Sequence, residues 1–358
     1  MEPAPRVLVV GGGLAGLLMV AELERRELAR AEVWSARPED KPFASSVAAG
    51  MFNPVSFRRL VPVWEAAHHM AGAEEIYRWA ESLLSVSLWN EIPLFKIFPN
   101  ADYADLWQNR LDSGHEVSEW IEPISWNTVH SLVNAPFGGG WVPRAGYVDL
   151  GQFISRFHHH LESEDRLHWR QWSFSDGLSE GFDAVIDCRG VGAVEDLKGW
   201  GLDVRPNHGE VLTLADPEGT LPRHTVNRKK WLLPLADGKT YRLGATYRWD
   251  LREPEKHAEA VTELLDAMSE GIHSELKKES IVAHKSGVRP ASPDRRPIVG
   301  RPDGASFPWY HLVNGLGTRG VLVGPRAVAE LASTFFEKSQ SDLHEDVICQ
   351  RFRTFKAP

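Results

Sequence analysis

The N-terminal stretch RVLVVGGGLAGLLMV constrains the fold more than any other part of the chain. Residues 6–10 are a short β-branched and leucine run, as expected of a strand buried on both faces, and helical periodicity follows the glycines. A second strand is expected at 31–35. In such a unit the spacing G-x-G-x-x-G brings backbone and the positive helix end to a pyrophosphate, and the chain has it at Gly11, Gly13 and Gly16. The stretch therefore predicts dinucleotide binding.

The motif alone does not identify the dinucleotide. The acidic residue expected about twenty positions later, at the end of the second strand, is replaced by Ser35. The Ser35 hydroxyl could still bond a ribose hydroxyl, and Arg37 could favour a 2′-phosphate. FAD and nicotinamide cofactors both remain open at this point.

Length and charge narrow the class of partner. At 358 residues the chain exceeds the usual size of one hydrophobic core, so two joined domains are expected. With 40 Lys and Arg against 49 Asp and Glu, the formal net charge of −9 favours a small-molecule substrate and makes a nucleic-acid partner unlikely. The two cysteines lack metal-ligand spacing. The sequence contains no run of about eighteen apolar residues, so no membrane span is predicted. We expect a cytoplasmic protein, and the sequence predicts no particular oligomeric state.

Several other elements can be predicted along the chain. Residues 36–63 form a connection too long for an ordinary βα loop and are therefore expected to be functional. The remaining expectations are helical, aromatic-rich sequence to about 111, a buried strand at 182–190, antiparallel strands at 205–250, a helix at 254–272, a strand at 309–315 and a helix at 325–338.

Five segments, in order, resemble the D-amino-acid oxidase, glycine oxidase and sarcosine oxidase superfamily of FAD-dependent flavoproteins. They are VLVVGGGLAG, FASSVAAGMFNP (43–54), RAGYVDLGQF (144–153), FDAVIDCRGVGA with the strands after it, and the pair GVRPASPDRRPIVG (287–300) and VNGLGTRGVLVGPRAVAELA (313–332). The last pair resembles the family most closely.

The resemblance implies an α/β fold, α+β overall, in which a Rossmann-type FAD-binding domain is interleaved with an antiparallel-sheet substrate domain, as in glutathione-reductase-like FAD/NAD(P)-binding folds. FAD is expected to be noncovalent, because the place where sarcosine oxidases carry a flavin-linked cysteine is near Gly287 and holds none. The implied domains are 1–82, 138–204 and 286–345 for FAD, 83–137 and 205–285 for substrate, and a tail at 346–358.

The same resemblance implies which residues contact FAD. Thr318 and Arg319 lie among glycines before a predicted helix, where backbone donors and the helix dipole could face the flavin's pyrimidine edge; alternatively, Arg319 is a structural charge. The expected cofactor residues are Gly11, Gly13, Leu14, Ala15, Gly16, Ser35, Arg37, Ser45, Ser46, Ala49, Gly50, Met51, Gly190, Gly315, Gly317, Thr318, Arg319 and Gly320.

Three residues are candidates for the chemistry. Arg289 stands where amino-acid oxidases of this family bind the substrate carboxylate, for which a guanidinium offers two parallel donors; the alternative is a structural ion pair. Arg242 resembles the position of an oxygen-activating lysine in sarcosine oxidases, and Tyr247 a substrate contact of glycine oxidases. Because strand residues alternate between faces, these two compete unless a bulge intervenes. Asp294 is expected to stabilise a turn.

Histidines and tryptophans have simpler interpretations. His68, His69 and the run 158–160 are expected on solvated helix faces, and without metal-ligand spacing no metal site is predicted. Trp64, Trp89, Trp141 and Trp231 are expected near the domain junction, where core packing is favoured over an aromatic pocket wall.

The expected function is oxidation of the C–N bond of a small amino acid or N-substituted glycine by hydride transfer to FAD, giving an imine that hydrolyses to an oxoacid and an amine. Oxygen or another carrier would accept the electrons. One alternative is a flavin oxidase acting on a carboxymethylaminomethyl-type tRNA base, against which the acidic balance argues. A second is a flavin-binding protein without turnover.

Overall fold

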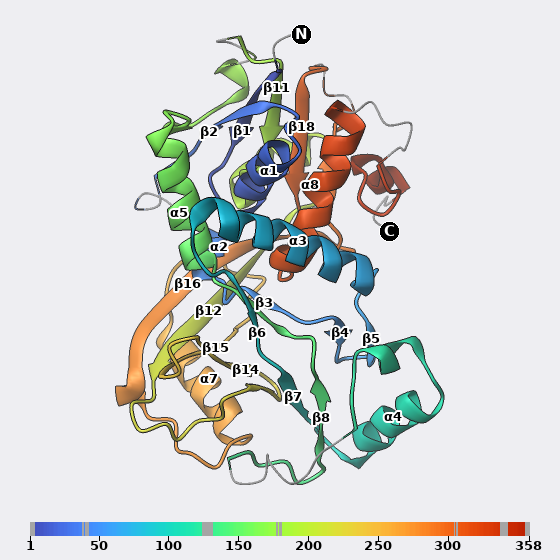
Figure 1. The fold of residues 1–358 in the computed structure, drawn as a ribbon, viewed down its shortest axis with the longest axis vertical. Helices are drawn as coiled ribbons and strands as arrows, with labels where there is room; N and C mark the ends of the chain where they lie inside the picture. Colours follow the sequence, from blue (N-terminus) through green and yellow to red (C-terminus); the bar gives the residue numbers. More distant parts are fainter. Residues whose placement is uncertain are drawn as a thin grey trace.

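A computed structural model describes residues 4–354 except 38, 40–42, 124–131, 177, 179–180, 304, 306 and 337–342. Two large sheets divide the molecule, and the long helix α3 (Ala66–Leu84) crosses between them (Figure 1). Among these residues, none of the helices combines the length and the hydrophobicity that a membrane span requires. The mixed architecture confirms the predicted fold class.

The six-stranded sheet lies in the upper half of Figure 1, beside α1 (Leu14–Arg25), α5 (Leu150–Ser163) and α8 (Gly320–Phe336). Its strands pair in parallel except for the antiparallel edge strand β17. Because both faces are covered, its central strands consist mainly of buried apolar residues, as at 7–10 in β1 and 184–186 in β11. In spatial order it contains β10 (Leu167–His168), β2 (Arg30–Trp34), β1 (Arg6–Val10), β11 (Ala184–Asp187), β18 (Tyr310–Asn314) and β17 (Ile298–Gly300).

The seven-stranded sheet lies in the lower half, and all its neighbouring strands are antiparallel except the β13–β7 pair. Helix α7 (Ala258–Ser269) packs Leu264 and Met268 into a core with Leu212 and Leu243 of the sheet. In spatial order the strands are β16 (Ile281–Ala291), β12 (Arg205–Ala215), β15 (Thr240–Gly244), β14 (Trp231–Pro234), β13 (Thr225–Asn227), β7 (Leu94–Ile97) and β8 (Gly139–Val142).

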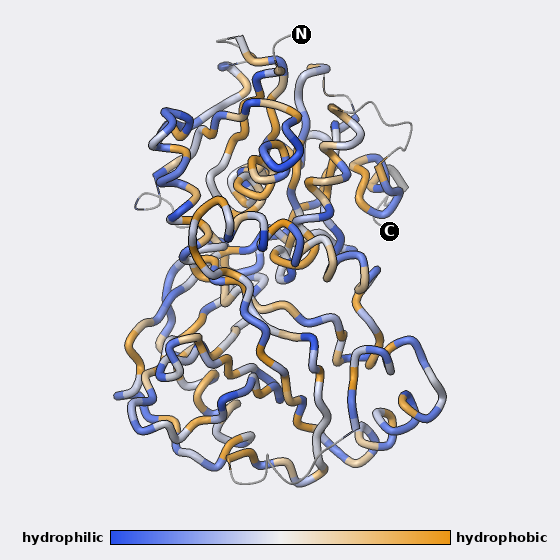
Figure 2. The backbone as a smooth tube through the Cα atoms, viewed as in Figure 1, coloured by the Kyte–Doolittle hydropathy of each residue, from blue (hydrophilic) through white to orange (hydrophobic). Residues whose placement is uncertain are grey.

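Smaller elements fill the space around the two sheets. Helix α4 (Ala101–Asp112), at lower right, is mostly hydrophilic in Figure 2. The others are α2 (Ala44–Val47), α6 (Val194–Gly199), the sheet of β3 (Met51–Phe52), β9 (Gly146–Val148) and β6 (Trp89–Glu91), the pair β4 (Val55–Ser56) and β5 (Val61–Pro62), and short 3-10 helices at Glu116–Glu119, Phe174–Asp176, Gly190–Ala193, Lys278–Ser280 and Cys349–Thr354.

Some elements differ from the sequence predictions. The stretch expected to be helical to 111 contains the strands β6 and β7, and β15 ends at Gly244 instead of continuing toward 250. Strand β16 runs across the expected domain boundary at 285/286, and β8 pairs in the lower sheet although 138–204 was assigned to the upper domain. A strand takes its place from hydrogen-bonding partners far away in the chain, which local composition does not reveal.

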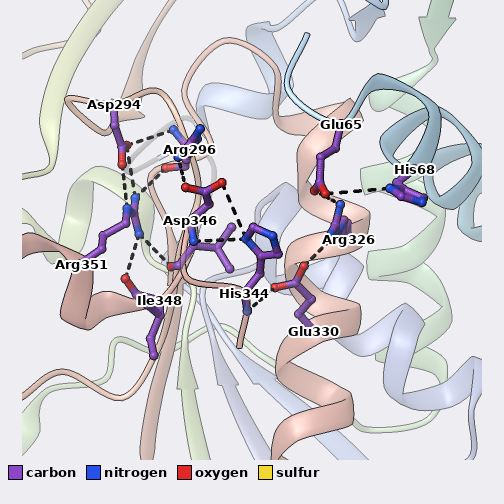
Figure 3. Close-up of polar contacts among 11 residues, drawn as sticks. Glu65, His68, Asp294, Arg296, Arg326, Glu330, His344, Asp346, Ile348 and Arg351 are labelled. Atoms are coloured by element: carbon purple, nitrogen blue, oxygen red, sulfur yellow. Dashed lines mark hydrogen bonds and ion pairs between the residues drawn. The ribbon is translucent and has the colours of Figure 1, made fainter. Parts of the chain in front are cut away.

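Hydrogen bonds and ion pairs connect the turn after β16 to the C-terminal segment, as Figure 3 shows. The Asp294 carboxylate accepts hydrogen bonds from the Arg351 guanidinium, the shorter at 2.7 Å, and from the Arg296 backbone N–H at 3.1 Å. Arg296 also pairs with Asp346. The described part of the expected tail is therefore packed against the upper sheet; residues 355–358 lie outside the described chain.

Candidate active site

The glycine turn after β1 brings two backbone segments into contact. Gly11 has a φ of 109°, and a β-carbon there would lie 2.7 Å from the Cys188 carbonyl oxygen. A β-carbon at Gly16 would lie only 1.9 Å from the Gly11 carbonyl oxygen. Only glycine fits at these two positions, so the first turn of α1 can start directly at the cavity wall, with N–H groups that have no partner within the helix.

Ser35 lies just after β2, beside this turn. Its hydroxyl accepts a hydrogen bond from the Gly12 N–H at 3.0 Å and donates one to the Ala36 carbonyl oxygen at 3.1 Å. Arg37 is exposed, with its guanidinium 5.7 Å from the centre of the Trp169 ring, and it does not line the cavity. Of these two residues, only Ser35 lines the cavity.

His158 also contacts the turn, although the sequence interpretation put it on a solvated face. It is buried on α5, with Nε2 2.8 Å from the Gly12 carbonyl oxygen, an atom that can only accept a hydrogen bond. Burial lowers the pKa of His158 and so favours the neutral ring, in which this contact places the proton on Nε2. The same expectation was wrong for His69, which is 1% exposed. Both rings lie on helix faces that pack against neighbouring elements.

The segment 43–54 forms the wall next to α1. The Ser45 hydroxyl accepts a hydrogen bond from the Leu14 N–H at 3.2 Å and so joins α2 to the start of α1. Ser46 does not line the cavity; it donates to the Phe43 carbonyl oxygen at 2.8 Å. The lining residues of this segment include Ser45, Ala49, Gly50 and Met51.

The loop between β18 and α8 forms another wall. It contributes Gly317, Thr318, Arg319 and Gly320, and because α8 begins at Gly320 its positive end lies at the cavity. Gly315 lies outside the lining, beside Ile298. No carboxylate among the described residues pairs with Arg319; burial and the charge of Arg295 lower its pKa, yet a guanidinium stays protonated.

These walls enclose one cavity of roughly 570 Å³ that extends from the glycine turn to Arg289. Of the expected residues, Gly16, Arg37, Ser46, Gly315 and Arg242 lie outside its lining. The other expected residues all line the cavity: Gly11, Gly13, Leu14, Ala15, Ser35, Ser45, Ala49, Gly50, Met51, Gly190, Gly317, Thr318, Arg319, Gly320, Tyr247 and Arg289.

Arg289 reaches the cavity from β16. Its Nη1 donates to the Asn207 side-chain oxygen at 3.0 Å and approaches the Thr246 carbonyl oxygen at 3.5 Å. On the facing strand β12, a β-carbon at Gly209 would lie 2.1 Å from the same nitrogen. Burial lowers the pKa of Arg289, and no carboxylate of the described chain forms an ion pair with it. The cavity therefore holds a partly desolvated positive charge that no acidic side chain among the described residues neutralises.

Tyr247 and Arg242 lie in different surroundings. Because β15 ends at Gly244, strand alternation does not extend to Tyr247, which lines the cavity with its ring 5.0 Å from the Arg289 guanidinium. Arg242 lies outside and donates to the Ala48 carbonyl oxygen at 3.2 Å. Further lining residues not singled out from the sequence are Phe57, Val211, Asn227 and Asn314, together with Trp231, for which core packing had been favoured.

Comparison with known proteins identifies the family of the chain. Residues 6–334 match the model of the FAD dependent oxidoreductase family, abbreviated DAO. The chain belongs to this FAD-dependent oxidoreductase family. The resemblance seen in the sequence is therefore confirmed.

Individual proteins similar to this chain have low sequence identity to it. Glycine oxidase of Pseudomonas aeruginosa is 27% identical, with 87% of this chain and 90% of that protein covered. The bifunctional protein ThiO/ThiG of Synechocystis is 23% identical over the whole chain, which spans only 56% of that relative's length. The structure of iminodiacetate oxidase from Chelativorans has a TM-score of 0.75 at 19% identity, covering 96% and 98% of the two chains. This structural likeness shows the fold.

The cavity fits the FAD that the family name specifies. The glycine turn and the starts of α1 and α8 offer N–H groups and positive helix ends suited to phosphates and to an electron-rich ring. Arg319 adds a positive charge without an acidic partner in the described chain. The residues that would hold FAD thus come from three parts of the sequence that the fold brings together.

Proposed function

We propose that the protein oxidises the C–N bond of a small amino acid or N-substituted glycine and releases an imine that hydrolyses to an oxoacid and an amine. Bound FAD would supply the two-electron acceptor for this reaction. We further propose that FAD is held noncovalently, because the C-terminal segments 287–300 and 313–332 contain no cysteine.

The observation that carries this proposal is the unpaired guanidinium of Arg289 in the cavity that would hold the flavin. Because no carboxylate in the described part of the chain pairs with it, an anionic ligand would stabilise its charge. A substrate carboxylate supplies two acceptors in the spacing of a guanidinium's parallel donors. Asn207 and the Thr246 carbonyl oxygen accept from Nη1 and so orient the group, while no bond to Nε or Nη2 is made within the described chain.

The other walls would position the rest of the substrate. Tyr247 lies against Arg289, where its ring can cover the bound carboxylate, and Trp231 and Phe57 add apolar surface that excludes water. A substrate held in this way would present its α-carbon to the flavin side of the cavity. Positioning of this kind can supply most of the rate acceleration when no protein base is required. Arg242, behind Ala48, would support the flavin wall instead of the substrate.

Charge reversal at Arg289 tests the proposal. We expect Arg289→Glu to lower kcat/KM for the best amino-acid substrate by about 100-fold or more, since losing one partner of a desolvated charge pair costs about 2–5 kcal/mol. The flavin absorption spectrum should persist. Arg205→Gln, at the exposed start of β12, is the matched control and should change kcat/KM less than twofold. Undiminished turnover in Arg289→Glu would rule out the carboxylate anchor.

A further inference from the structure

A second group of ionisable side chains lies on the opposite face of β12 from the cavity. Along this strand, Asn207, Gly209 and Val211 face Arg289 or the cavity. Strand residues alternate, so His208 and Glu210 point the other way. There they meet two further histidines, His257 at the start of α7 and His284 on β16.

Glu210 is the centre of this group. Its carboxylate is nearly inaccessible, at 2% side-chain exposure. One oxygen lies 3.0 Å from His257 Nδ1, and the other lies 2.7 Å from His284 Nε2 and accepts from the His257 backbone N–H at 2.9 Å. A buried carboxylate surrounded by imidazoles needs positive charge nearby.

His208 supplies the observation that points to a cation. The ring is fully buried, and its Nε2 lies 2.9 Å from the Glu255 carbonyl oxygen. Because that oxygen can only accept, Nε2 carries the proton and Nδ1 of the neutral ring carries a lone pair. This Nδ1 has no hydrogen-bond partner among the described residues. An imidazole that donates one N–H to a backbone carbonyl and leaves the other nitrogen free is arranged as metal-binding histidines are.

We propose that His208, Glu210 and His257 bind a divalent transition-metal ion of the zinc class. One ligand atom from each residue lies within 4.8 Å of the others, and the described chain contains no second group of this kind. Two imidazoles and a carboxylate are an established donor set for zinc, with a fourth position left for water. His257 is 33% exposed and gives the ion a path from solvent, while His284 holds the second carboxylate oxygen.

The ion would stabilise the wall of the cavity instead of taking part in the reaction. The Glu210 backbone N–H donates to the Thr246 hydroxyl at 2.9 Å, and the Thr246 N–H donates to the Glu210 carbonyl oxygen at 3.2 Å. His208 and Arg248 exchange backbone hydrogen bonds in the same way. The metal site therefore lies directly behind the segment that carries Tyr247, and its occupancy can be measured without substrate.

The test is equilibrium dialysis of the chelator-treated, flavin-bound full-length protein against zinc ions, with zinc measured by elemental analysis. We expect one zinc ion per chain and a zinc-dependent rise in Tm, because a ligand that binds only the folded state stabilises it. His257→Gln and His208→Gln should weaken zinc binding by about tenfold or more. His159→Gln, on the exposed face of α5, is the matched control and should bind zinc as the parent does.

Two results would overturn the site: no zinc retained by the parent protein at micromolar free zinc, or equal zinc affinity in His257→Gln. The partly exposed His257 keeps the test decisive should the buried His208→Gln fail to fold. Retained flavin absorption and far-UV circular dichroism would show that His257→Gln is folded.

Discussion

Arg289 occupies space that a side chain on the facing strand would otherwise fill. A β-carbon at position 209 would lie 2.1 Å from the Arg289 guanidinium. Because the guanidinium is the far end of a long side chain, it would move aside and the backbone would stay in place. Gly209 is therefore expected to set the position of the proposed carboxylate anchor while contributing little to folding.

Gly209→Ala tests this at the residue scale. We expect the displaced guanidinium to raise KM for the amino-acid substrate by about tenfold, since one misplaced hydrogen-bonding group costs about 1.4 kcal/mol. Flavin content and Tm should stay close to those of the parent. Gly72→Ala, where a β-carbon meets nothing within 4 Å, is the control. An unchanged KM in Gly209→Ala would contradict the proposal that Arg289 binds the substrate carboxylate.

At this scale, the sequence predicted residues whose type is specific to a motif and missed residues that act through the fold. Arg289 belongs to a recognisable G-x-R-P pattern, but nothing local relates Gly209 to it. A glycine inside a strand signal is a sign of close approach, which could have marked this position. His158 contacts Gly12 from a helix 146 positions away in sequence, a relation that spacing cannot reveal.

At the scale of elements, the β1 turn and α1 form a unit that depends on glycine for its geometry. A β-carbon at Gly16 would meet the Gly11 carbonyl oxygen at 1.9 Å, and backbone cannot move aside as a side chain can. Helix α1 would have to move away from β1, and the N–H groups at its start would no longer face the same point.

We therefore expect Gly16→Ala to abolish FAD retention and to destabilise the protein by about 1–3 kcal/mol, the typical range of overpacking in a tight core. Flavin absorbance after gel filtration and urea denaturation measure the two effects. Gly72→Ala in α3, away from the cavity lining, is again the control, because its β-carbon would meet nothing within 4 Å. Full flavin content in Gly16→Ala would contradict the proposed role of the turn.

The predicted elements were most accurate where the physics is local. The apolar run of β1 coincides with residues 6–10, and β2 and β18 fall within one residue of their expected bounds. Strands β6 and β7 are three and four residues long and pair with segments distant in sequence, so the aromatic-rich stretch around them looked helical. Helix α8 begins at Gly320, five residues before Pro325, so this proline lies inside the helix and not at the helix start that the sequence predicts for it.

At the scale of the whole molecule, one buried histidine, His69, and two partly buried ones, His224 and His311, make stability depend on pH. Burial, as the largest cause, lowers the pKa of His69, His224 and His311 from 6.5 to about 4 in the folded protein. As pH falls, the unfolded chain therefore takes up protons first. The stability contributed by these rings is complete above pH 6.5 and is lost as pH falls from about 6.5 to about 4.

We expect the free energy of unfolding to decrease by roughly 2 kcal/mol per histidine between pH 7.5 and pH 5. Urea denaturation at the two pH values measures it. In His69→Leu this decrease should be smaller by the contribution of one histidine, roughly 2 kcal/mol. In His159→Gln, where the histidine is exposed on α5, the decrease should equal that of the parent protein. A pH dependence that is identical in His69→Leu and the parent would show that His69 is not neutral in the folded state.

The central claim is that one cavity holds FAD and, at Arg289, the carboxylate of a small amino acid. The most direct measurement is anaerobic titration of the flavin absorption spectrum with glycine, sarcosine, proline and D-amino acids, each matched by the amine that lacks its carboxylate. The account predicts an oxidised-flavin spectrum that an amino acid bleaches and that its matched amine bleaches at least about 100-fold less efficiently. Equal bleaching by an amino acid and its decarboxylated partner, or a protein that cannot be loaded with FAD, would contradict it.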